Sequence, residues 1–264
     1  MTISKDLLLA ILSLDSYSRG YGAAVDDGEG TDDGLGKSSV GNTTYKIDST
    51  TKLGLDNTKA AGFYAVSYTV GEGVDGIADG TTVISYRGTD NFGEYYNADR
   101  GANDILNGWL GGSGTPTSQT SLALEFYRSV TGKSVFEGAA ENTILTGHSL
   151  GGGLAGLVSA LSTTPGLGYD YMPFGLLSYA HYYYEQISGG AVQNAPQFSQ
   201  FDGIYVSGEA LQAGRNGIAQ GGITLSLSVL SGLLGFIPLV GPALTALTGL
   251  GAFETVTTPF LELR

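Results

Sequence analysis

Residues 142–153 read NTILTGHSLGGG, a β-branched and apolar run followed by a histidine and a serine enclosed by glycines. The run predicts a strand over 141–147, because β-branched residues favour strands. The segment LGGGLAGLVSALSTT (150–164) predicts a helix, which Pro165 and Gly166 close. Ser149 therefore falls on a sharp strand-to-helix turn.

Gly147-His148-Ser149-Leu150-Gly151 fits the pattern G-x-S-x-G. Side chains two residues to either side of the serine would collide in such a turn, so glycine is required at both positions. The first amide groups of a helix lack intrahelical partners, and the N–H of Leu150 can therefore hold a developing oxyanion. Ser149 is a candidate nucleophile. The simpler interpretation is a glycine-rich helix start with the serine as N-cap.

The flanking segments predict the rest of the fold. Two strands joined by a glycine-rich turn are expected first, then a helix, then two strands after the serine. An amphipathic helix is expected near the N-terminus. The predicted strands are 60–70, 80–90, 167–175 and 201–211, and the other predicted helices are 3–17 and 120–134. This alternation predicts an α/β fold of one domain, with a mainly parallel central sheet and helices on both faces.

Composition excludes several classes of protein. With 12 Lys and Arg against 25 Asp and Glu, the net charge is −13, which argues against nucleic-acid binding. The chain has no cysteine, so it can form neither a disulfide nor a thiolate zinc site.

The acidic run DDGEGTDDG (26–34) could hold a structural calcium ion, although its spacing matches no EF-hand and a solvated loop is the simpler interpretation. No organic cofactor or catalytic metal is expected.

The segment 216–253 carries no charged residue and is mostly apolar. Pro238 and Pro242 interrupt it near its middle, which favours two short helices over a membrane-spanning helix. Such a pair fits ordinary core, or an apolar lid-like insertion that contacts a membrane surface.

The N-terminus has neither a basic leader nor a cleavage site, so we expect no signal peptide. The composition suits a secreted bacterial protein exported without one.

The stretch TGHSLGGGLAGLVSAL (146–161) resembles the nucleophile elbow of α/β-hydrolases, and specifically of class 3 lipases. VISYRGTDN (83–91) is similar to the strand end that supplies the second oxyanion donor in those lipases. The resemblance covers about residues 60–165. It implies an α/β-hydrolase fold and an oxyanion hole formed by the N–H groups of Leu150 and Thr89, helped by the Thr89 hydroxyl. The implied activity is that of a serine carboxylester hydrolase, a lipase or esterase, which cleaves acylglycerols or similar water-insoluble esters at a lipid–water interface through an acyl-enzyme.

The resemblance also predicts an acid and a base. The acid falls at Glu209, where those lipases carry an aspartate, with Asp170 one strand earlier as the alternative. In that fold the histidine follows the acid in the chain, yet no histidine follows Glu209. His148 belongs to the elbow, and His181 precedes the acid. We expect the base to come from a C-terminal segment beyond Arg264, with His181 or no base at all as the alternatives.

On this expectation the chain is the N-terminal catalytic part of a larger secreted bacterial lipase and lacks its C-terminal strand and helix. An alternative function is that of a catalytically silent protein of the same fold. Such a protein would bind a membrane or a partner through its apolar tract.

Overall fold

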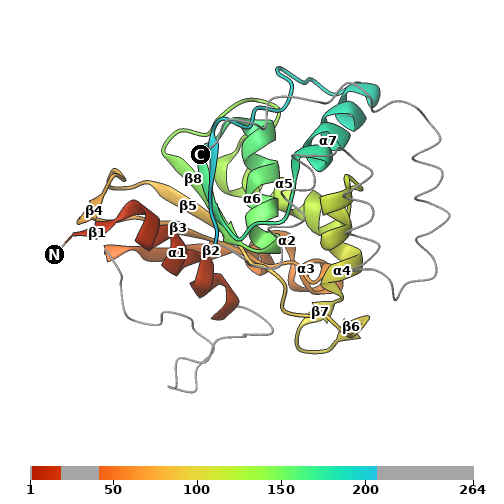
Figure 1. Ribbon diagram of the computed structural model, residues 1–264, viewed down its shortest axis with the longest axis horizontal. Coiled ribbons are helices and arrows are strands. Elements are labelled where there is room, and N and C mark those ends of the chain that lie inside the picture. Colours follow the sequence, from red (N-terminus) through yellow and green to blue (C-terminus); the bar gives the residue numbers. More distant parts are fainter. Residues whose placement is uncertain (1, 19–41, 207–264) are drawn as a thin grey trace. The chain divides into compact units, whose positions relative to one another are not determined.

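The computed structural model of the chain describes residues 2–18 and 42–206, and six of their strands form one central sheet (Figure 1). The spatial order is β10-β9-β8-β5-β3-β2, in which the first four strands are parallel and the last two are antiparallel to their neighbours. The bounds are β2 (Thr44–Asp48), β3 (Ala65–Thr69), β5 (Thr82–Tyr86), β8 (Thr143–His148), β9 (Gly166–Tyr169) and β10 (Phe201–Ile204). The predicted α/β fold with a mainly parallel sheet is confirmed.

Helices flank the sheet (Figure 1). On one face, α6 (Leu150–Ser162) packs on β8 and β9, and α5 (Ser118–Thr131) lies against α6. On the other face, α1 (Lys5–Asp15) packs on β8 and β5. The shorter elements are β1 (Ile3–Ser4), η1 (Ser16–Ser18), α2 (Ser49–Leu53), α3 (Leu55–Ala61), β4 (Val74–Asp75), β6 (Tyr96–Asn97), β7 (Gly101–Ala102), α4 (Asp104–Asn107) and η3 (Trp109–Ser113), and the last helix is α7 (Gly175–Ile187).

Alternation along β5 divides the hydrophobic core in two, because successive side chains of a strand point to opposite faces. Ile84 and Tyr86 pack in the cluster formed with α5 and α6. Val83 packs instead with three buried leucines of α1, which are Leu8, Leu9 and Leu12. The helix is fastened to the sheet by a 2.9 Å hydrogen bond between the Ser13 and Thr146 hydroxyls. Both faces of the sheet are thereby covered over its central strands.

The strands near the C-terminal side are shorter than predicted. β9 ends at Tyr169, because Asp170 adopts a left-handed backbone conformation with φ of 43°. Helix α7 begins at Gly175, within the stretch predicted as strand. β10 ends at Ile204. The acidic run 26–34, Glu209 and the apolar tract 216–253 lie outside the described residues. In the described part of the chain, none of the helices is both long and apolar enough to cross a membrane.

Candidate functional site

The carboxyl ends of the parallel strands meet at one edge of the sheet. Tyr86 at the end of β5 is in register with Gly147 of β8, and His148 is in register with Tyr169 of β9. The residues that follow each strand must therefore lie at the same edge. This brings the turn 87–90, Ser149 and Asp170 together.

Ser149 occupies the turn between β8 and α6, as predicted, and its backbone is strained. Its φ of 58° and ψ of −124° lie in a region that residues other than glycine rarely adopt. Its N–H donates to the carbonyl of Tyr169 and its carbonyl accepts from the N–H of Met172, each at 2.9 Å. These bonds from the neighbouring segment hold the serine in the strained conformation. Ser149 is the N-cap residue of α6, but its side chain makes no cap hydrogen bond to the helix.

Both glycines of the motif are required by close backbone contacts. A Cβ at Gly147 would lie 2.5 Å from the carbonyl oxygen of Gly151. A Cβ at Gly151 would overlap the carbonyl oxygen of Tyr86 and lie 2.7 Å from the carbonyl carbon of Arg87. Real Cβ atoms do not approach backbone this closely. The start of α6 is therefore pressed against the end of β5.

The two candidate oxyanion donors lie at this contact. Leu150 is the first residue of α6, so its N–H has no intrahelical acceptor. In the turn that follows β5, a Cβ at Gly88 would lie 2.6 Å from the carbonyl oxygen of His148. Thr89 follows Gly88 and Ser149 follows His148, so both residues come directly after this backbone contact.

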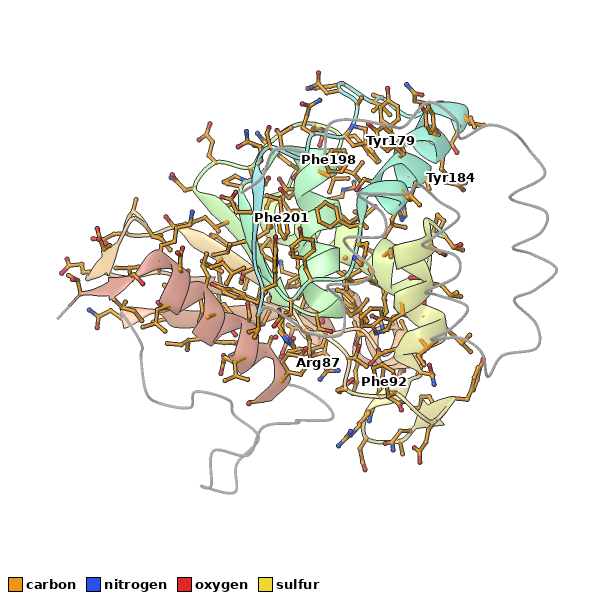
Figure 2. The ribbon with its side chains drawn as sticks, viewed as in Figure 1. Arg87, Phe92, Tyr179, Tyr184, Phe198 and Phe201 are labelled. Atoms are coloured by element: carbon orange, nitrogen blue, oxygen red, sulfur yellow. The ribbon has the colours of Figure 1, made fainter. Side chains whose placement is uncertain are left out.

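A buried ion pair closes the turn that carries Thr89. Arg87 Nη2 lies 3.1 Å from Asp90 Oδ2, and the two side chains are 1% and 0% exposed. The Arg87 guanidinium also lies over the ring of Tyr64, 5.0 Å from its centroid. Arg87 and Phe92 both come from the segment that follows β5 (Figure 2). A turn fixed at both ends holds the Thr89 backbone in one orientation.

Asp104, at the start of α4, holds the same turn from the other side. Its Oδ2 accepts the backbone N–H of Asp90 at 2.9 Å and that of Asn91 at 3.0 Å. Gln119 donates to its Oδ1 at 2.6 Å. Burial raises the pKa of Asp104, and burial raises the pKa of Asp90 to about 7 although Arg87 acts in the opposite direction. Sequence reasoning missed Asp104 as a site residue, because it lies 14 positions from Asp90 and no local pattern relates the two.

His148 is bonded to Tyr17 of η1 rather than to the serine. Its Nδ1 lies 2.9 Å from the Tyr17 hydroxyl. Burial lowers the pKa of His148 although Asp170 acts in the opposite direction, and burial raises the pKa of Tyr17. Both shifts favour the neutral groups, and the Tyr17 hydroxyl also donates to the carbonyl of His148 at 3.5 Å. Tyr17 joins the elbow to the N-terminal helix, which no short-range pattern in the sequence indicated.

His181 lies on α7 and its ring contacts α5. Its Nε2 is 3.1 Å from the hydroxyl of Thr120, and burial lowers the pKa of His181 to about 4. No hydrogen bond joins it to Ser149. Within residues 2–18 and 42–206, the Ser149 hydroxyl has no hydrogen-bond partner. Of the two candidate acids, Asp170 is at the serine edge of the sheet, and Glu209 is outside the described residues.

The described residues contain no cluster of three or more histidine, aspartate or glutamate side chains that could hold a metal ion. Neither a protein-family model nor a curated protein matches the chain.

Proposed function

We propose that the protein is a serine carboxylester hydrolase, a lipase or esterase of the α/β-hydrolase fold. The observation that carries the proposal is the backbone of Ser149, with φ of 58° at the carboxyl edge of a parallel sheet. Such a conformation costs about 1–3 kcal/mol in a residue other than glycine, and strain of this kind gathers at functional sites. A serine that only began a helix would not need it.

The proposed reaction begins when Ser149 Oγ attacks the ester carbonyl carbon. The carbonyl π pair moves to oxygen, and the N–H groups of Leu150 and Thr89 stabilise the resulting oxyanion. The serine proton passes to a base and then to the departing alkoxide, which leaves as the alcohol. Water hydrolyses the acyl-enzyme by the same route. Because Tyr17 and Thr120 engage the two histidines, we propose that the base comes from outside the described residues, as does the acid, Glu209.

A water-insoluble ester, such as an acylglycerol, is the proposed substrate class. Three aromatic side chains of the segment after the Thr89 turn are largely exposed, namely Phe92 (59%), Tyr95 (79%) and Tyr96 (54%). Exposed aromatic side chains in the segment that follows the Thr89 turn suit an apolar acyl chain or a lipid–water interface. We also propose that the tract 216–253 acts as a lid in a secreted enzyme that needs no cofactor.

Labelling with a fluorophosphonate tests the proposal, because this probe reacts covalently with activated serine nucleophiles. The protein as its gene encodes it should be labelled at Ser149 and should hydrolyse a p-nitrophenyl ester. Ser149→Ala should lose both properties, whereas Ser121→Ala, at an exposed position on α5, should keep them. A folded protein that is never labelled contradicts the proposal. That result favours a catalytically silent protein that binds a membrane or a partner.

A further inference from the structure

Residues 108 and 109, where α4 gives way to η3, contact both candidate oxyanion donors. A Cβ at Gly108 would overlap the side chain of Leu150 and lie 2.8 Å from Oε1 of Gln119. The next residue, Trp109, donates its indole N–H to the hydroxyl oxygen of Thr89 at 2.7 Å. One short segment therefore touches Leu150 with its backbone and Thr89 with its side chain.

The chemistry of the two groups fixes the direction of this bond. An indole nitrogen is a donor only, whereas a threonine hydroxyl has one O–H donor and two acceptor lone pairs. Thr89 must therefore accept, and its own proton stays available for another acceptor. Among the residues that the structure describes, no group accepts that proton. Thr89 is only half-buried, so the proton can reach a bound molecule.

The packing around Trp109 keeps the indole in place. The ring of Phe92 lies 6.5 Å from that of Trp109, in a tilted arrangement. The Thr89 backbone is held independently by the Arg87–Asp90 ion pair. The Thr89 backbone is fixed, and its hydroxyl oxygen is held by the Trp109 N–H, so rotation of the hydroxyl is restricted. A hydroxyl that accepts a hydrogen bond is also polarised and donates more strongly.

We propose that Trp109 is a positioning residue that directs the Thr89 hydroxyl to donate a third hydrogen bond to the oxyanion. The inference rests on the proposed ester hydrolase activity and concerns the same site. The charge that develops on the carbonyl oxygen is strongest in the tetrahedral intermediate. The third donor therefore lowers the barrier to the chemical step and affects ground-state binding little.

Four variants test this, assayed on a soluble p-nitrophenyl ester with the chain as its gene encodes it. Trp109→Phe keeps the ring but removes the N–H, and should lower kcat by about 10-fold with KM within about 2-fold. Thr89→Val, which removes the hydroxyl, should lower kcat by at least about 10-fold. Thr89→Ser keeps a hydroxyl and should retain most of the wild-type kcat. In the double variant Trp109→Phe/Thr89→Val, the tryptophan change should add nothing, because its target is gone.

Additive losses in the double variant would overturn the inference, as would a change confined to KM. A structural role for Trp109 predicts such additivity, together with a lower midpoint of urea unfolding. The two proposals can be distinguished. If the wild-type protein is neither labelled by a fluorophosphonate nor active, the proposed function is wrong. If the wild-type protein is labelled and active but Trp109→Phe has the same kcat, only the inference about Trp109 is wrong.

A second measurement needs no variant of Trp109. This residue is the only tryptophan in the sequence, so the intrinsic tryptophan fluorescence of the protein reports on it alone. A fluorophosphonate that reacts with Ser149 loses fluoride and leaves a phosphonate ester, whose phosphoryl oxygen carries a partial negative charge and lies where the oxyanion would form. Its binding should shift the emission of the unchanged protein and leave that of Thr89→Val unshifted. Identical shifts in the two proteins would contradict a coupling through the Thr89 hydroxyl.

Discussion

Gly151 sets how closely α6 can approach β5, because any side chain there would meet the backbone of Tyr86 and Arg87. We expect Gly151→Ala to lower the free energy of unfolding by at least about 2 kcal/mol, since backbone atoms cannot move aside cheaply. Gly93→Ala is the matched control, because a Cβ at Gly93 would meet no atom within 4 Å. Urea unfolding of both variants measures the difference. Equal stabilities would show that the α6–β5 contact is looser than described.

Among single residues, the sequence predicted those whose roles depend on residues adjacent to them in the chain. Gly147, Ser149 and Gly151 form a local pattern, and the structure places them on the expected turn. Tyr17 could not be predicted, because it reaches His148 only after folding brings together residues 131 positions apart. Trp109 is likewise 20 positions from Thr89, and no periodicity relates the two.

Helix α1 covers one face of the sheet, and the exposure of its leucines differs sharply along the helix. Leu8 is fully buried in the cluster with Val83, whereas Leu7 is 55% exposed. Leu8→Ala should lower the free energy of unfolding by about 2–5 kcal/mol through lost burial and a residual cavity. Leu7→Ala should change it by no more than about 0.5 kcal/mol. Thermal or urea unfolding distinguishes them, and similar losses in both variants would argue against the described packing of α1.

The contact between α7 and α5 should make stability depend on pH. Burial lowers the pKa of His181 from 6.5 to about 4, so the unfolded chain binds a proton more readily than the folded protein between these values. The contribution of the neutral imidazole is complete above about pH 6.5 and is lost as the pH falls through 6.5 towards 4.

His181→Gln removes the titration and keeps a side chain that can bond to Thr120. Between pH 7 and pH 4, the wild-type protein should lose up to roughly 3 kcal/mol more unfolding free energy than this variant. The measurement is urea unfolding of both proteins over that range. A constant difference between them would mean that His181 is not shielded from water.

Elements were predicted best where apolar periodicity and breaker residues agree, as in α6 and β8. Helix α7 was missed, because its tyrosines favour strands by intrinsic preference. Tertiary packing, rather than intrinsic preference, makes this segment helical. His181 and Leu177 are one helical turn apart and both buried, and Tyr179 packs on Phe198 with ring centroids 5.9 Å apart (Figure 2). The early end of β9 depends on the left-handed Asp170, whose conformation no sequence pattern required.

Considered as a whole molecule, the protein is strongly acidic, with a net charge of −13. Exposed charges act over about 30 Å at 0.01 M salt but only about 3 Å at 1 M. If the substrate is an ester at an interface, hydrolysis at a surface containing anionic lipid should be several-fold slower than at a neutral surface in dilute salt. The two rates should converge in 1 M NaCl, because salt screens the repulsion at both surfaces to about 3 Å. Measured rates that differ equally at all salt concentrations would contradict this.

The attachment of α1 also has a consequence for synthesis on the ribosome. Two of the partners that fasten this helix lie far downstream: Ser13 bonds to Thr146 across 133 positions, and the Tyr169 hydroxyl donates to the carbonyl of Asp6 across 163. At about 5–20 residues per second, roughly 7–26 s pass between translation of the helix and translation of β8. During that interval its leucines can pack only on the strands already made, such as β5 with Val83. Helix α1 can therefore complete its docking only after β8 and β9 are made, and a nascent chain halted before β8 should expose part of this helix to chaperones.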